Sequence, residues 1–315
     1  MKNVRQLILM ASLGLLLCAA CSRRELLDDY PVVTVQIGLC WDETVLAGGT
    51  MPEGMRAIFY PHDPAGRKVD VYLPVNGGEV KIPPGHYSVV VYNYDTETVL
   101  IRGEEAYETI EAYTNFCRLE VAGTEKMVWG PDALYTTRID DVEIDGAGEP
   151  VLLDVAPRLV VSTHPFNLKT VRLDNVGSAY GSVEGMADCY LLGKGCGKND
   201  GSPVYFDVEK GDGVLKGAFT TFGMPGVAVT RADEGVTMKL TLIKVDRSVQ
   251  KVEIDITQTV VPPGGQEEEK PAPEISLPEG SVIEVEEVAP VPDGGGFGGE
   301  VGEWGNETEV ELPMN

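Results

Sequence analysis

Cysteine is the residue type whose positions in this 315-residue chain most clearly indicate chemistry. Cys21 stands directly after the small pair Ala19–Ala20, behind a basic head at Met1–Arg5 and an apolar run at Leu7–Leu17. The run is too short to cross a bilayer as a helix. A basic head, a short apolar run and small residues before the cleavage point are the order of a secretory signal peptide, which is predicted at residues 1–20.

The same segment resembles a bacterial lipoprotein signal, in which the new N-terminal cysteine is acylated. Position −3 departs from the usual pattern, because it is Cys18 where leucine is expected. Cleavage before Cys18 would place the bulky Leu17 at the small-residue site, so Cys21 is the predicted lipidation site. Each buried methylene of an acyl chain contributes roughly 0.8 kcal/mol, so several chains hold a protein in the outer membrane durably. The alternative is an ordinary secreted protein.

Four further cysteines remain after processing: Cys40, Cys117, Cys189 and Cys196. An even number of cysteines outside the cytoplasm permits disulfides. Cys189 with Cys196 would close a small loop, and Cys40 with Cys117 a longer one. Four cysteines allow three connectivities, between which the sequence does not choose. The alternative is that all four are reduced residues of the core.

The composition is acidic, with 25 Lys and Arg against 50 Asp and Glu and a formal net charge of −25. Nucleic-acid binding needs a basic surface, so a nucleic-acid partner is not expected. A basic patch that would adhere to anionic lipid is excluded for the same reason. The acidity itself indicates solubility outside the cell.

Motifs for catalysis or cofactors do not emerge. The histidines His62, His86 and His164 have no cysteine or carboxylate at ligand spacing, so no metal site is predicted. The stretch Gly193–Lys198 lacks the Ser or Thr that a phosphate loop places after its lysine. Asp141–Gly146 starts like a calcium loop, but the twelfth position is Leu rather than Glu. We therefore expect a non-enzymatic protein without a cofactor.

The elements that would position these residues are strands. Period-two alternation of β-branched and aromatic residues, interrupted by turn residues every eight to twelve positions, indicates an all-β fold. A tether is expected at residues 21–30 and a first β-sandwich at 31–156, with Asp145–Gly146 as a hairpin turn. The predicted strands of this unit are Val32–Leu39, Arg56–Tyr60, Val69–Leu73, Glu79–Ile82, Tyr87–Tyr94, Thr98–Arg102, Ala133–Ile139, Val142–Ile144 and Val151–Val155. Tyr87, Tyr92 and Tyr94 are expected to pack in the core rather than to form an exposed platform for a ligand.

A second β-sandwich is expected at residues 157–260, which gives two tandem antiparallel β-sandwiches. Its predicted strands are Arg158–Ser162, Leu168–Leu173, Val183–Leu192, Val204–Val208, Leu215–Phe222 and a long hairpin, Val236–Val245 with Val249–Val260.

Residues 261–315 form an acidic tail rich in Pro and Gly. Two late strands are expected within it, Ser281–Val288 and Glu309–Leu312. They would either return to the second sandwich or pair with a partner, and the alternative is a wholly disordered tail.

Several segments together carry a family resemblance. They are Cys21–Leu27, Cys40–Trp41, Ile82–Asn93, Gly185–Ala187, Thr220–Gly223, the Val236–Val260 hairpin and Val301–Trp304. In this set the chain resembles Bacteroidales surface lipoproteins related to fimbrillin anchors. Ile82–Asn93 is similar to the Pro-Gly-x-Tyr entry into the first, transthyretin-like sandwich of that family, and the later segments to its second, fimbrillin-like sandwich.

The resemblance implies a fimbrial anchor or accessory subunit at the outer membrane, with fimbrial subunits or other surface proteins as partners. In such systems one chain supplies a β-strand that completes a sheet of the next, mainly through backbone hydrogen bonds. The candidate partner strands lie in the tail, at Val282, Val285 and Val288 or at Glu309, Val310 and Leu312. A binding module for a glycan or a host protein at the cell surface is the alternative.

Overall fold

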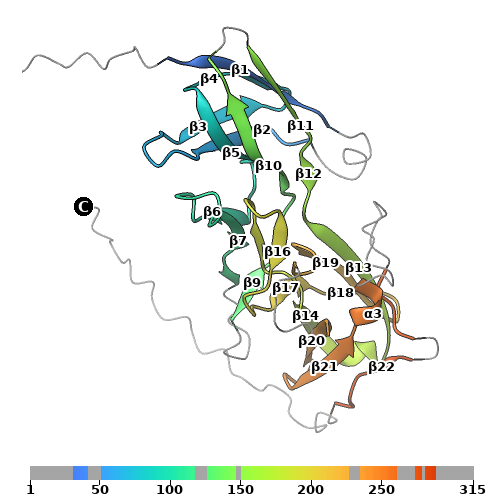
Figure 1. The fold of residues 1–315 in the computed structure, drawn as a ribbon. Coiled ribbons are helices and arrows are strands. Elements are labelled where there is room, and N and C mark those ends of the chain that lie inside the picture. The colour runs from blue at the N-terminus through green and yellow to red at the C-terminus, as the bar shows by residue number, and fades with distance from the viewer. Residues whose placement is uncertain are drawn as a thin grey trace, which may run out of the picture.

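The computed structural model describes residues 31–41, 51–117, 126–146, 150–226, 235–260, 274–278 and 281–288. These residues form an all-β protein, as predicted, with only a 3₁₀ turn η1 at Leu173–Asn175 and a short helix α3 at Thr257–Val260. Figure 1 shows an upper and a lower group of strands, with β6, β7 and β16 between them. Among the described residues, no helix is long and apolar enough to cross a membrane.

The first sandwich packs a three-stranded sheet, in the order β11-β1-β4, on a five-stranded sheet, β12-β10-β5-β2-β3. Val33, Val35, Ile37 and Leu39 alternate inward along β1 as the period-two pattern predicts. The strands are β1 (Val33–Leu39), β2 (Gly54–Pro61), β3 (Val69–Pro74), β4 (Gly77–Ile82), β5 (Gly85–Asn93), β10 (Tyr135–Ile144), β11 (Val151–Val155) and β12 (Arg158–Leu159).

Strand β10 replaces two of the predicted strands and contains a β-bulge. Its pairing with β5 shifts register between Ile139 and Val142, so Asp140 and Asp141 are both exposed. The predicted hairpin at Asp145–Gly146 is wrong, because β10 pairs with β5 whereas β11 pairs in parallel with β1 in the other sheet. The connection therefore crosses between the two sheets.

The second sandwich packs the sheet β18-β19-β13-β22 on the sheet β21-β20-β14-β17-β9-β8. Phe206 lies in its core, and its ring centroid is 5.3 Å from that of Phe166 and 5.3 Å from that of Phe219. The strands are β8 (Phe116–Cys117), β9 (Met127–Trp129), β13 (Ser162–Val171), β14 (Val176–Glu184), β17 (Val204–Asp207), β18 (Glu209–Lys210), β19 (Val214–Thr221), β20 (Thr237–Lys244), β21 (Val249–Asp255) and β22 (Ile283–Glu284). The predicted hairpin is present as β20 and β21, and the residues after β21 form α3 instead of extending it.

A third sheet lies between the sandwiches. Its order is β16-β15-β7-β6, and its strands are β6 (Val99–Arg102), β7 (Glu111–Thr114), β15 (Cys189–Leu191) and β16 (Cys196–Lys198). The predicted strand Val183–Leu192 is divided here, because Gly185 has a φ of 89° and ends β14 before β15 begins. Strands from both halves of the chain thus pair in one sheet.

Beneath this sheet lies a separate hydrophobic cluster, which we call the middle core. Ile58 and Val90 contribute to it from the five-stranded sheet, Ile110 and Leu192 from the third sheet and its connections, and Phe222 from the end of β19. Each is at most 3% exposed. The part of the five-stranded sheet's outer face around Ile58 and Val90 is therefore buried, like the inner face.

Candidate assembly site

The outer edge of β13 is closed by residues from the C-terminal part of the chain. β22 pairs in parallel with Thr170 and Val171. Further along the same edge, the Ile275 N–H donates to the Pro165 carbonyl at 2.8 Å, and the Asn167 N–H donates to the Ile275 carbonyl at 3.0 Å. Proline has no N–H to offer a neighbouring strand, which is the chemistry expected at a sheet edge. Residues 274–278 and 281–288 thus cover the edge of this sheet with backbone contacts to β13.

Three apolar side chains insert from this segment into the second core. Ile275, Ile283 and Val285 are 1%, 4% and 0% exposed. Burying side chains of this size contributes about 1.5–3 kcal/mol each before the entropy of ordering the segment is subtracted. The segment is therefore held by a few large contacts rather than by a long ladder.

Polar contacts fix the same segment on its other side. The Arg172 guanidinium donates to the Val285 carbonyl at 3.0 Å. Gln250 donates to the Glu284 carbonyl at 2.8 Å and accepts from the Glu286 N–H at 2.9 Å. The Lys244 ammonium lies 3.0 Å from a Glu286 carboxylate oxygen. These bonds place β22 between β13 and the β20–β21 hairpin.

The predicted partner strands have different positions relative to this arrangement. Val285 points into the core of its own chain, Val282 is 42% exposed and Val288 is partly buried. The inward face is formed by Ile283 and Val285, so the segment has returned to the second sandwich, which was one of the two expected alternatives. Glu309, Val310 and Leu312 lie outside the described residues, as does the predicted lipidation site Cys21.

The four described cysteines are free thiols in this structure, so neither predicted disulfide is formed in it. Cys189 stands opposite Lys198 and Cys196 opposite Leu191, two register positions away from a direct pair. Cys40 is exposed after β1, whereas Cys117 is buried in β8 of the second sandwich. Burial is the main cause that raises the pKa of the Cys189 thiol to about 12, which keeps it protonated and unreactive near neutral pH.

Two of the three tyrosines predicted to pack in the core, Tyr87 and Tyr92 of β5, are buried, whereas Tyr94 just after β5 is not. Tyr87 and Tyr92 are both 2% exposed, in the first core and the middle core respectively. Tyr94 is 44% exposed and lies edge-on to Tyr72, with ring centroids 5.2 Å apart. Within the described residues, the exposed part of the predicted aromatic set is therefore reduced to one ring and its neighbour.

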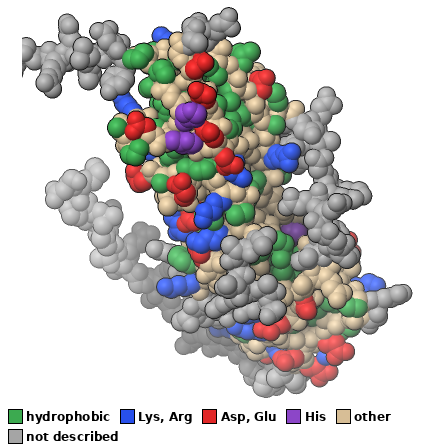
Figure 2. Space-filling view, in the orientation of Figure 1, with side chains coloured by type: hydrophobic (Ala, Val, Ile, Leu, Met, Phe, Trp, Pro, Cys, Tyr) green, Lys and Arg blue, Asp and Glu red, His purple; other side chains and the backbone are tan. Residues whose placement is uncertain are grey.

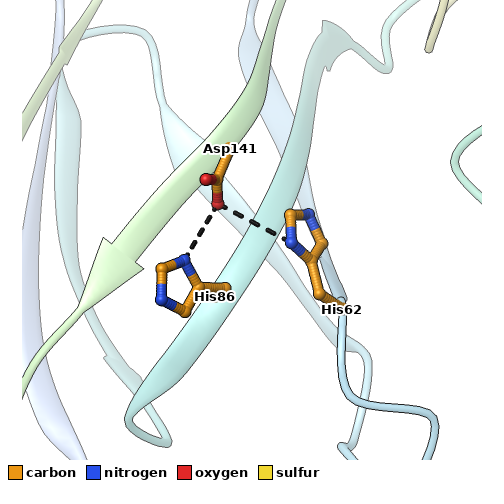
Figure 3. Close-up of side chains that lie close together, drawn as sticks. All are labelled: His62, His86 and Asp141. Carbon is orange, nitrogen blue, oxygen red and sulfur yellow. Dashed lines mark hydrogen bonds and ion pairs between the residues drawn. The ribbon is translucent and has the colours of Figure 1, made fainter.

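A side-chain cluster that the sequence did not indicate lies beside the start of β5. His62, His86 and Asp141 place their ligand atoms within 4.8 Å of one another (Figure 3). The prediction that no histidine has a carboxylate beside it is wrong for these two, because they come from different strands and meet only in the sheet. The register break in β10 was the available signal, since it divides the predicted strands Ala133–Ile139 and Val142–Ile144 at Asp140–Asp141.

A neighbouring cleft opens beside this cluster. Its lining includes Tyr60, His62, Lys68, Ser88 and Tyr107. The Lys68 ammonium donates to the Glu104 carbonyl at 2.9 Å, and the Tyr107 hydroxyl donates to the Asp140 carboxylate at 2.7 Å. Nucleophilic Ser–His geometry for acyl transfer does not arise here, because the Ser88 hydroxyl donates to a backbone carbonyl instead of to the imidazole.

These features define an all-β protein whose two sandwiches share a middle core and whose last described strand closes its own sheet. Residues 20–207 match the DUF5119 family, described as a domain of unknown function. The chain belongs to this family.

Three known proteins are similar to this chain in sequence or in structure. The chain is 46% identical, over the full length of both proteins, to the "Putative fimbrium anchoring subunit Fim4B" of Bacteroides ovatus. A crystal structure of a "putative adhesin" from Bacteroides ovatus is 46% identical, with a TM-score of 0.72 over 85% of this chain and 98% of that one. The fimbrial anchor protein Mfa2 of Porphyromonas gingivalis is 13% identical, with a TM-score of 0.47 over 75% of this chain and 86% of that one. The predicted resemblance to fimbrillin-associated anchor subunits is confirmed.

Proposed function

We propose that this protein is a non-catalytic fimbrium-anchoring subunit, held in the outer membrane by a lipid on Cys21 and joined to a fimbrial subunit by β-strand addition. The full-length relative named as a fimbrium anchoring subunit supports the role. The basic head, apolar run and small residues before Cys21 support the lipid anchor. A fixed N-terminus at the membrane leaves the second sandwich as the end that meets the filament.

The observation that carries the strand-addition part is the edge of β13. The sheet β18-β19-β13-β22 ends in β22, a strand of only two residues, and the bridge at Ile275 supplements it. A strand from another subunit would make the same kind of backbone hydrogen bonds along this edge. We infer that residues 282–288 close the edge in the free subunit and are exchanged on assembly, and that Glu309–Leu312 is the second candidate donor strand.

Locking the segment tests this inference. Val171 and Glu284 are register partners on the exposed side, so Val171→Cys with Glu284→Cys would tie β22 to β13 after oxidation. A matched control is Ile243→Cys with Val249→Cys, which are register partners in β20 and β21. Both pairs are made with Cys40→Ser, since Cys40 is an exposed thiol.

The readout is a crosslinking pull-down of the tagged, lipidated protein from the outer membrane of its own host, with protease shaving of intact cells. We expect filament subunits to be recovered with the control pair and lost with the β13–β22 pair, and recovery to return on reduction. Equal recovery with both pairs would exclude exchange of residues 282–288. Unchanged partner binding after deletion of residues 294–315 would exclude Glu309–Leu312.

The same experiment separates the alternative function. A protein that is sensitive to shaving but recovers no filament subunit in any form would support capture of a glycan or a host protein at the surface. A Cys21→Ala variant that stays in the membrane fraction would contradict the lipid anchor.

A further inference from the structure

We propose that His62, His86 and Asp141 form a surface site for a divalent transition-metal ion, with Zn²⁺ as the reference ligand. The Asp141 carboxylate oxygen Oδ1 lies 3.1 Å from His86 Nδ1 and 3.7 Å from His62 Nδ1 (Figure 3). Ligand atoms around a tetrahedral Zn²⁺ with bonds of about 2.0–2.1 Å lie about 3.3 Å apart. Two imidazoles and a carboxylate at this spacing suit Zn²⁺, and also Ni²⁺ or Cu²⁺.

The backbone holds the three ligands on neighbouring strands. His62 directly follows β2, and its N–H donates to the His86 carbonyl at 2.9 Å. The two imidazoles are stacked, with centroids 6.2 Å apart and planes at 19°. Asp141 comes from β10, on the far side of β5 from β2. Two of the ligands therefore sit on adjacent strands of one sheet, and the third directly follows the next strand.

The bulge in β10 is what brings the carboxylate to this face. Before the bulge Ile139 packs on the first core, and after it Val142 and Ile144 do, so the inward parity changes from odd to even. Asp141 and Glu143 consequently point outward on the same side as His86, which is the register partner of Glu143. Without the extra residue Asp141 would face the core.

The tautomer of His62 is set at Nε2, the ring nitrogen that faces Ser88 rather than Asp141. The single hydroxyl hydrogen of Ser88 is donated to the Asp140 carbonyl at 2.6 Å. The Ser88 oxygen can then only accept from His62 Nε2, which lies 2.9 Å away. The neutral His62 ring therefore carries its hydrogen on Nε2 and turns a lone pair on Nδ1 toward the Asp141 carboxylate. Two acceptor atoms then face one another, and a metal ion between them would satisfy both.

Among the described residues, no lysine or arginine neutralises the carboxylates of this cluster. Neither Asp141 nor Glu143 forms an ion pair with a lysine or arginine of the described residues, whereas the adjacent Asp140 pairs with Arg138. Glu143 lies 3.9 Å from His86 Nε2, the nitrogen away from Asp141, where a carboxylate orients a metal-bound imidazole. Figure 2 shows histidine side chains together on this face with acidic side chains around them.

A second group of ligand-type residues has the opposite character. Glu111, Cys189 and Asp200 also lie within ligand distance of one another. Arg102 and Lys198 form ion pairs with both Glu111 and Asp200, so this group already has its cations. It serves as the internal comparison for the histidine cluster.

Exposure indicates what such a site would offer. His62, His86 and Asp141 side chains are 44%, 51% and 60% exposed. Three protein ligands leave at least one coordination position for water or for a side chain from another molecule. The proposal does not depend on the proposed role in fimbriae.

Isothermal titration calorimetry of the full-length chain in detergent, with ZnCl₂, NiCl₂, CaCl₂ and MgCl₂ as separate titrants, tests the site. All proteins carry Cys40→Ser, because an exposed thiol is itself a Zn²⁺ ligand. We expect one saturable Zn²⁺ site, with no matching Ca²⁺ or Mg²⁺ site, that disappears in His62→Gln and in His86→Gln. Glu79→Gln, an exposed carboxylate on β4, is the charge-matched control for Asp141→Asn and leaves binding unchanged.

Positioning residues are tested by a different readout. Ser88→Ala should weaken Zn²⁺ about tenfold or more, as loss of an outer-shell partner typically does, and should change the His62 tautomer in the imidazole nitrogen NMR spectrum. Near-UV circular dichroism checks that each variant is folded. Zn²⁺ binding that survives His62→Gln with His86→Gln but is lost in Cys189→Ser would place the metal at the other group. The absence of saturable Zn²⁺ binding would overturn the proposal. So would imidazole NMR signals that shift with pH but not when Zn²⁺ is added.

Discussion

The middle core and the edge of β13 are closed in opposite ways. Strands from both halves of the chain cover the middle core, and Ile58, Ile110 and Leu192 in it are at most 1% exposed. The edge of β13 is covered by residues 274–278 and 281–288, which contribute two backbone hydrogen bonds at Ile275 and a two-residue strand. The contrast teaches that the joint between the sandwiches is a structural centre, whereas the edge of β13 is closed by only a few contacts.

Truncating the middle core should give the largest effect. Ile58 is fully buried on β2, and Ile58→Ala is expected to lower the free energy of unfolding by about 3–4 kcal/mol through lost transfer energy and the cavity left behind. Chemical denaturation followed by tryptophan fluorescence and circular dichroism measures this. Because both sandwiches share the core, signals from the two halves should shift together.

The control is Leu152→Ala on β11, whose side chain is 74% exposed, with an expected change within about 0.5 kcal/mol. Trp41 reports on the first sandwich and Trp129 on the second. Single-tryptophan versions of the parent that unfold at different denaturant concentrations would mean that the middle core does not couple the two halves.

The first sandwich was the more predictable region. Alternation along β1 identified its inward side chains, and the predicted strands Arg56–Tyr60, Val69–Leu73 and Glu79–Ile82 fall within β2, β3 and β4. One buried face opposite one polar face is what period-two reasoning detects. In such regions the local pattern and the tertiary structure agree.

The middle core was not predictable by the same reasoning. Strand β5 is buried on both faces, so Val89 and Val90 are both apolar and no alternation marks which face is the core. β7 and β16 were missed as strands because they are short, and the β7 partner β15 also lies far away in the chain. The histidine cluster was missed for a related reason, because His62, His86 and Asp141 meet only through sheet register.

Loosening the edge of β13 should give a smaller and local effect. Val285→Ala removes two buried methyl groups from the docked segment and is expected to cost about 2 kcal/mol. Val282→Ala in the same segment is the matched control, because Val282 is 42% exposed. Hydrogen exchange should show faster exchange of the Asn167 and Ile275 amides in Val285→Ala, while the middle core keeps its protection.

A uniform loss of protection in Val285→Ala would contradict the comparison, since the edge would then unfold only with the whole protein. Equal effects of Val285→Ala and Val282→Ala would show that burial of Val285 does not hold the segment.

The rim of the middle core is held by Arg56. Its guanidinium donates to Asp70 at 2.6 Å and to Glu104 at 2.6 Å, which ties β2 and β3 to the residues after β6. Arg56→Met should cost about 1–2 kcal/mol, discounted for the partial exposure of the carboxylates. Arg67→Met, at an exposed position, is the control and should have almost no effect.

The pH dependence of this variant gives a second check. The Arg56 hydrogen bonds are the main cause that lowers the pKa of Asp70. A carboxylate with a lowered pKa in the folded state adds stability above its unfolded pKa of about 3.9, and that stability is lost as the pH falls through the folded value. The difference between parent and Arg56→Met should therefore shrink in acid. A difference that stays constant down to that range would mean that packing, not charge, accounts for the effect.

His164 should give the smallest effect, and it concerns the second sandwich near its junction with the middle core. The ring is stacked 5.0 Å from Phe219, and neither nitrogen has a hydrogen-bond partner among the described residues. Burial lowers the pKa of His164, so the unfolded chain takes up a proton first as the pH falls. With an unfolded pKa of about 6.5, this proton costs the folded state at most about 0.7 kcal/mol between pH 7 and pH 6.

His164→Phe keeps a ring against Phe219 and removes the titrating group, so its stability should depend less on pH than that of the parent between pH 7 and pH 6. Comparing denaturation midpoints of the two proteins at each pH cancels the contribution of all other ionisable groups, because both proteins share them. Parallel curves would contradict the argument, since they would mean that the His164 ring is hydrated or protonated without cost in the folded protein. A flatter curve for His164→Phe would show that the surroundings of the His164 ring stay dry in the folded protein, as the middle core does.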